Sequence, residues 1–161
     1  MVMLCAVTSL EAQFDSLRME METAVTGGTG DNLPFWLQSN RYGSIANESW
    51  QGNVRARIYD PVNAQRRISG YYGFSFVGGL HEDPRVYAEE WYGGLKLGFM
   101  RVEAGARKRI LRDYFHENGS GDLIWSANHR PIPEIILSTY DYADIPFTRG
   151  WLQFNTGISH G

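Results

Sequence analysis

The sequence predicts an all-β fold: an antiparallel meander that forms part of a transmembrane outer-membrane β-barrel and is incomplete in this chain. Three observations support this prediction. Apolar and polar residues alternate with period two, no stretch reaches the ~18 apolar residues of a membrane-spanning helix, and the 161 residues include 18 glycines and 14% aromatic residues. Only a closed barrel satisfies strand backbone groups in hydrocarbon, so a membrane protein of this kind must cross as strands.

Residues 1–13 have the character of a truncated export signal. They are mostly apolar and end in small residues around Ala12, although a basic n-region is missing. We therefore expect a cleaved signal peptide at 1–13, followed at 14–161 by the N-terminal part of the barrel domain. The single cysteine, Cys5, lies in the signal, which would leave the mature chain without disulfides or thiolate chemistry. Lipid anchoring at Cys5 is the alternative, and the residues around it make a poor lipobox.

Beyond the signal, strands are expected throughout and no helix. In the segment 53–59, for example, Val54 and Ala56 alternate with Arg55 and Arg57, so one face is apolar and the other charged. The same sorting in 100–110 sets an apolar face against one that carries Arg101, Glu103, Arg107 and Arg109. The candidate strands, in order, are residues 16–25, 53–59, 66–80, 86–97, 100–110, 134–140 and 151–159.

The connections differ in length. Residues 60–64 and 98–99 predict tight turns, whereas 111–133 is long and rich in glycine, proline and polar residues. Short turns at one end and longer loops at the other are typical of outer-membrane barrels. A soluble β-sandwich with one wet face shows the same period-two pattern. The barrel is favoured because several candidate strands reach the ~9–11 residues of a tilted bilayer crossing.

Four blocks of sequence are informative as an ordered set. They are PFWLQSNRYG at 34–43, GARKR at 105–109, WSANHRPIPEI at 125–135, and IPFTRGWL at 145–152 with ISHG at 158–161. In this order they resemble the capsule assembly proteins of the Wzi family, over nearly the whole chain beyond the export segment. Full-length members of that family are much longer. We therefore expect an N-terminal portion, whose isolated sheet would have an unpaired edge.

The resemblance implies an outer-membrane lectin that attaches capsular or related surface polysaccharide to the cell surface, without catalytic chemistry. The expected partners are that polysaccharide and outer-membrane lipid. A porin-like diffusion channel is the alternative from another functional class, and a soluble β-sandwich binding module is the third. A lectin should have a folded-in loop that binds sugar, whereas a channel should have an open lumen.

Arginines on the predicted inner face have two interpretations. They could hold an acidic polysaccharide, because guanidinium groups bind carboxylates through paired hydrogen bonds. Alternatively they form ion pairs with Glu90 and Glu103 that keep a wide barrel rigid, which is favoured for the arginines in mid-strand. Arg107 and Arg109 lie nearest the long loop and are the better candidates for contact. The inner-face arginines are Arg55, Arg57, Arg67, Arg101, Arg107 and Arg109.

The long loop carries the residue types of a sugar site. Sugars have apolar C–H faces flanked by hydroxyls, which suit an aromatic platform beside short polar side chains. Trp125 could instead anchor at the membrane interface, and Arg41 could belong to a simple turn. The candidate polysaccharide-binding residues are Trp125, Asn128, His129, Arg130, Arg107, Arg109 and Arg41.

Other functions lack support in the sequence. His116 and Glu117 do not have the spacing of a metalloprotease motif, and Asp141 and Asp144, which could serve a glycosidase, lie in a turn. The net charge of −3 comes with no basic stripe for nucleic acid. We expect no enzymatic activity, no cofactor and no metal.

Overall fold

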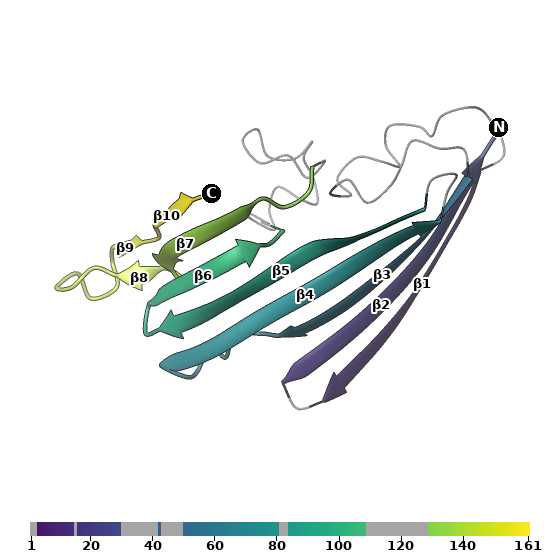
Figure 1. Ribbon diagram of the computed structural model, residues 1–161. Helices are drawn as coiled ribbons and strands as arrows, with labels where there is room; N and C mark the ends of the chain where they lie inside the picture. Colours follow the sequence, from purple (N-terminus) through teal and green to yellow (C-terminus); the bar gives the residue numbers. More distant parts are fainter. Residues whose placement is uncertain (1–2, 15, 30–41, 43–49, 81–83, 109–128) are drawn as a thin grey trace.

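The computed structural model describes the chain except for residues 1–2, 15, 30–41, 43–49, 81–83 and 109–128. The described residues form an eight-stranded antiparallel sheet in the order β1-β2-β3-β4-β5-β6-β7-β10, with β8 and β9 as a separate small hairpin (Figure 1). The predicted all-β class and antiparallel meander are confirmed. Among these residues, no helix has the length and apolar character needed to cross a membrane.

The strands follow one another along the chain and across the sheet. From β1 to β5 they are 11 to 13 residues long. The bounds are β1 Met3–Phe14, β2 Leu17–Gly28, β3 Trp50–Asp60, β4 Ile68–Leu80, β5 Arg85–Leu97, β6 Met100–Ala106, β7 Pro133–Thr139, β8 Ala143–Asp144, β9 Gln153–Phe154 and β10 Gly157–His160.

Two strand predictions are wrong in extent. The strand expected at 100–110 ends at Ala106, whose partner on β7 is Pro133. Proline has no N–H to continue the ladder, so the pairing stops there. The single strand expected at 151–159 is divided, because Phe154 pairs with β8 while the Thr156 carbonyl accepts a 2.8 Å hydrogen bond from the Thr139 N–H.

The segment assigned to an export signal is in the sheet. β1 pairs with β2 along its full length, from Met3 opposite Gly28 to Phe14 opposite Leu17. The hydroxyls of Thr8 and Thr23 also hydrogen-bond across this pair. The cleaved signal peptide at 1–13 stays a prediction, and its removal would make β2 the edge of the sheet.

One face of the sheet is apolar and open to the surroundings. Side chains such as Phe76 on β4 and Ile135 on β7 are 47% and 62% exposed. In a soluble domain, an apolar sheet face of this kind packs against the hydrophobic core. Large exposed apolar residues on β2 to β7 include Met21, Val54, Tyr72, Phe76, Trp91, Leu95, Val102, Ile135 and Leu137.

The opposite face is polar and much less accessible. Polar side chains pack against one another there, together with a few aromatic rings. The period-two sorting of the sequence therefore predicted the two faces correctly. Buried residues of the polar face include Gln51, Ser69, Ser75, Glu90, Lys96, Glu103 and Ser138.

Two aromatic rings on the polar face lie over glycines of the neighbouring strand. Tyr71 on β4 is directly opposite Gly94 on β5, and Tyr92 on β5 is directly opposite Gly73 on β4. A Cβ atom on Gly94 would lie 2.3 Å from Cζ of Tyr71, and one on Gly73 would lie 2.5 Å from Cζ of Tyr92. Only glycine leaves room for these rings, which lie 6.4 Å apart.

We predict that Gly94→Val destabilises the protein by roughly 1–3 kcal/mol, because the new side chain forces Tyr71 off its place. The matched control is Gly93→Val, since a Cβ at Gly93 meets nothing within 4 Å. Thermal unfolding followed by circular dichroism would compare the two variants. Equal unfolding temperatures would contradict the packing role of the tyrosine–glycine pair.

Candidate functional site

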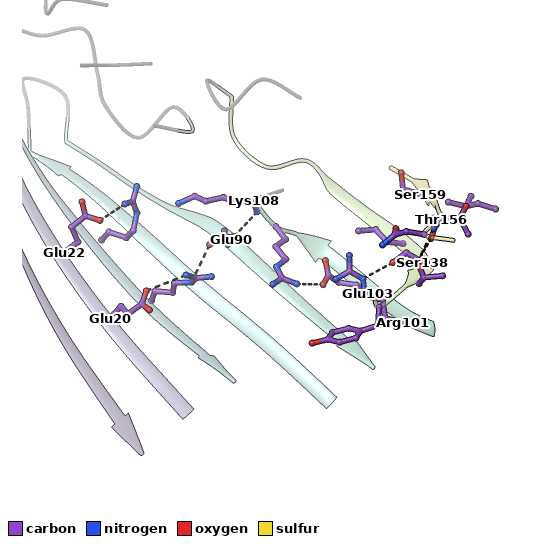
Figure 2. A pocket seen from close by; sticks show the side chains of 18 residues that line it. Glu20, Glu22, Glu90, Arg101, Glu103, Lys108, Ser138, Thr156 and Ser159 are labelled. Atoms are coloured by element: carbon purple, nitrogen blue, oxygen red, sulfur yellow. Dashed lines mark hydrogen bonds and ion pairs between the residues drawn. The ribbon is translucent and has the colours of Figure 1, made fainter. Parts of the chain in front are cut away.

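The polar face of the sheet lines a cavity of about 790 Å³, which we call the polar trough. Figure 2 shows its side chains extending from β2 to the segment that leads into β10. Hydroxyl and amide side chains at the β7 and β10 end include Ser138, Thr139, Asn155, Thr156 and Ser159. The charged residues that line it are Glu20, Glu22, Arg55, Arg57, Glu90, Arg101, Glu103, Arg107 and Lys108.

A β-bulge on β5 brings two consecutive carboxylates to this face. Ser75 pairs with Glu90 and Phe76 with Ala88, so Glu89 is the extra residue between two paired positions. Both glutamates are buried, with exposed fractions of 1% for Glu89 and 2% for Glu90. The bulge therefore doubles the negative charge that β5 contributes at this point.

Arg55 on β3 joins two of the carboxylates. Its Nε and Nη2 donate to Oε2 and Oε1 of Glu89 at 2.9 and 3.0 Å, which is the paired geometry that suits a guanidinium. Its Nη1 donates to Glu22 on β2 at 2.7 Å. Lys108, just after β6, places Nζ 2.7 Å from Glu89 Oε2. Glu89 thus holds two cations that come from different parts of the sheet.

Arg57 lies one step along the same strand and is paired more loosely. Its nitrogens are 3.5 Å from Glu20 and 3.6 Å from Glu90, and its guanidinium lies 4.4 Å from the Tyr59 ring centroid. The backbone N–H of Lys108 donates to Glu90 at 2.8 Å. Glu90 therefore also ties the end of β6 to β5.

Arg107 forms a third pair. Its Nη1 lies 2.6 Å from Glu103 Oε2, and its guanidinium is 4.3 Å from the Tyr92 ring centroid. Burial alone would lower the pKa of the Arg107 guanidinium, but the Glu103 carboxylate, together with Tyr92 and Tyr71, offsets this and the pKa is raised. Arg107 is therefore a permanent cation fixed between a carboxylate and an aromatic ring.

For Lys108 the net change in pKa has the opposite sign. Burial lowers the pKa of its ammonium by more than the hydrogen bond to Glu89 raises it. Glu89 compensates the removal of both Lys108 and Arg55 from water, and Glu22 adds a second ion pair to Arg55. The integrity of this end of the trough therefore depends on Glu89.

The structure separates the predicted polysaccharide-binding residues. Arg107 lines the trough and is paired with Glu103. His129 and Arg130 are exposed and do not line it; the Arg130 guanidinium lies 3.7 Å from the Tyr87 ring centroid. The remaining predicted residues, Trp125, Asn128, Arg109 and Arg41, lie outside the described residues.

Sequence reasoning missed several charged residues of the polar face. Strict alternation from Trp91 would place Glu89 on the apolar face. A glutamate at an apolar position was the available signal for a bulge. Lys108 was missed because alternation would place it on the face opposite to Arg107. The strand ends at Ala106, and after it both Arg107 and Lys108 line the trough. Glu20 and Glu22 fell in a candidate strand whose faces were not assigned.

Chemically, the described part of the trough is a wall of fixed charges of both signs, four carboxylates and five cations. Within the described residues there is no group of three or more His, Cys, Asp or Glu side chains that could hold a metal ion. The arrangement suits hydrogen bonding to a polar ligand or to water.

We predict that Glu89→Gln costs about 3–5 kcal/mol of folding free energy, because it leaves Arg55 and Lys108 without their buried carboxylate. Glu22→Gln is the comparison, since Glu22 is one-third exposed and makes one ion pair with the same arginine, worth about 0–1 kcal/mol. Urea unfolding monitored by tryptophan fluorescence would measure both. Equal losses would show that the bulge carboxylate has no special role.

Comparisons of this chain with protein-family models, with curated proteins and with solved structures find no match. The resemblance to the Wzi family therefore stays a prediction from the four sequence blocks.

Proposed function

We propose that this chain is part of an outer-membrane β-barrel that acts as a lectin in capsule assembly and holds capsular or related surface polysaccharide at the cell surface. The observation that carries the proposal is the inverted sorting of the sheet: large apolar side chains are exposed while charged side chains are buried on the other face. Lipid on one side and a wet lumen on the other account for both halves of this observation.

The alternative of a soluble sandwich fits this sorting less well. Monomeric soluble proteins rarely expose a contiguous apolar patch larger than a few hundred Å², whereas here exposed apolar residues occur on every strand from β2 to β7. Strands of 11 to 13 residues, such as β3 and β4, also reach the ~9–11 residues of a tilted bilayer crossing.

The sugar-binding part of the proposal is supported by the four sequence blocks and by the chemistry of the trough. Sugar hydroxyls need donors and acceptors that are fixed in place, and the ion pairs of Arg55, Arg57 and Arg107 fix such groups along the wall. The stack of Arg130 on Tyr87 adds an exposed cation beside an aromatic ring, close in sequence to the predicted loop site.

A porin-like diffusion channel is the second candidate. Fixed charges of both signs along a wall, as in the polar trough, are also what an aqueous channel displays. The two functions differ in ion conductance and in polysaccharide retention. A channel conducts ions across a planar bilayer, whereas a lectin retains polysaccharide with little conductance.

The lipid-facing assignment is tested at Ala56, an exposed residue in the middle of β3. We predict that Ala56→Arg destabilises the protein in phospholipid vesicles by about 2–4 kcal/mol, because a charge on the lipid face near mid-bilayer costs that much. Ala56→Leu should be neutral or stabilising. Urea midpoints in vesicles would measure both, and an arginine variant as stable as the leucine variant would count against a lipid-facing sheet.

The lectin function is tested in cells that carry the complete protein. We predict that Trp125→Ala combined with Arg130→Ala lowers the amount of polysaccharide retained on the cell surface while the protein stays at normal levels in the outer membrane. Arg66→Ala, at the short connection between β3 and β4, is the control. Unchanged retention would remove these two residues from the site, and high conductance in a planar bilayer would favour the channel.

A further inference from the structure

One row of cross-strand partners on the polar face is positively charged. Ser69 on β4 is directly opposite Lys96 on β5, Lys96 is opposite Arg101 on β6, and Arg101 is opposite Ser138 on β7. Like charges directly opposite each other destabilise a strand pair. The row includes no carboxylate. By contrast, the row through Arg57 has Glu20 on β2 and Glu90 on β5.

Among the residues that the structure describes, Lys96 has no acidic partner. It is buried, with an exposed fraction of 5%. Its Nζ donates hydrogen bonds to the backbone carbonyls of Ala64 and Arg66, and it lies 4.8 Å from the ring centroid of Tyr140. Carbonyls and a ring orient the ammonium but leave its full positive charge beside Arg101.

Arg101 differs from the other arginines of the trough. Its Nε donates to Ser138 Oγ at 2.8 Å. Glu103, two residues further along β6, is bound to Arg107. Within the described part of the chain, Arg101 forms no ion pair, whereas Arg55, Arg57 and Arg107 each form at least one. A guanidinium has five N–H donors, and among the described residues one of those on Arg101 is used, in the hydrogen bond to Ser138.

The surroundings of Arg101 suit a sugar. Figure 2 shows Arg101 pointing to Ser138, with Thr156 and Ser159 beside them at the β10 end of the trough. Two hydrogen bonds fix the backbone of Thr156 to Thr139. The Thr156 carbonyl accepts from the Thr139 N–H at 2.8 Å, and the Thr156 N–H donates to the Thr139 hydroxyl at 3.1 Å. The Ser138 hydroxyl is held by Arg101 and the Thr156 hydroxyl is on a fixed backbone, so these groups and the guanidinium match a ligand with a carboxylate and several hydroxyls.

We propose that Arg101, with Ser138 and Thr156, forms a subsite for an acidic sugar that carries a carboxylate, such as a hexuronic acid unit of a polysaccharide. This inference rests on the proposed lectin function and names the chemical class of its ligand. The carboxylate pairs with the free N–H groups of Arg101 through two parallel hydrogen bonds. Lys96 strengthens the local positive potential, and the hydroxyls of Ser138 and Thr156 hydrogen-bond to the hydroxyls of the sugar.

The test uses the complete protein in detergent micelles and isothermal titration calorimetry. The probes are an oligogalacturonate and the same oligosaccharide with its carboxyl groups reduced to neutral hydroxymethyl groups. We expect the wild type to prefer the acidic form and Arg101→Gln to weaken its binding about tenfold or more, as for the loss of a charged hydrogen-bond partner. Binding of the neutral form should change little.

Two further variants sharpen the result. Arg101→Lys keeps the charge but not the two-pronged geometry, so it should bind the acidic probe with intermediate affinity and tests the subsite even if Arg101→Gln folds poorly. Arg67→Gln makes the same change in net charge at an exposed position outside the trough, and should bind like the wild type.

The outcomes separate the subsite from the lectin function. If Arg101→Gln and Arg101→Lys bind oligogalacturonate like the wild type, or if the wild type shows no preference for the acidic probe, the subsite is overturned. Polysaccharide retention that still depends on the protein would then leave the lectin function standing. If deletion of the protein leaves retention unchanged and neither probe binds, the lectin function falls as well.

Discussion

The pairing of buried charges on the polar face is the interaction on which the rest of this structure depends. Charged side chains that are buried on one face of a sheet need polar or charged partners nearby, because an unpaired buried charge costs several kcal/mol. Arg55 does this with Glu22 and Glu89, and Arg107 does it with Glu103. The pairs of Arg55 join β2, β3 and β5, and the pair of Lys108 with Glu89 ties the segment after β6 to β5, so the electrostatics of the face also hold the strands in register.

The bulge at Glu89 provides an additional carboxylate partner for the buried cations of the polar face. A regular strand could present only one of two successive residues to the polar face. The extra residue lets Glu89 and Glu90 both point there, where they meet Arg55, Arg57 and Lys108. Bulges are frequent next to functional sites, where they re-aim a side chain. Here the re-aimed carboxylate ties Lys108, and with it the segment after β6, to the middle of the sheet.

The trough has two regions, which differ in whether their arginines are paired with carboxylates. At the β2 to β5 side the two arginines that line the trough, Arg55 and Arg57, are both paired, so this region is a rigid wall. At the β6, β7 and β10 side, Arg101 has a serine partner and hydroxyl-bearing neighbours. A binding surface needs fixed groups with unused hydrogen-bonding capacity. The rigid region supports the geometry, and the second region has capacity for a ligand.

The sequence by itself determined the strand content, the meander, and the sorting of residues such as Val54 and Arg55 to opposite faces, because side chains alternate every two residues along any strand. It also indicated that charged residues share one face. Only the tertiary structure decided that Glu89 belongs to that face, that the strand at 151–159 is divided, and that, among the described residues, Arg107 pairs with Glu103 while Arg101 bonds to Ser138. These outcomes depend on register and on a bulge, which arise from pairing between segments far apart in the chain and leave no periodic signal in the segments themselves.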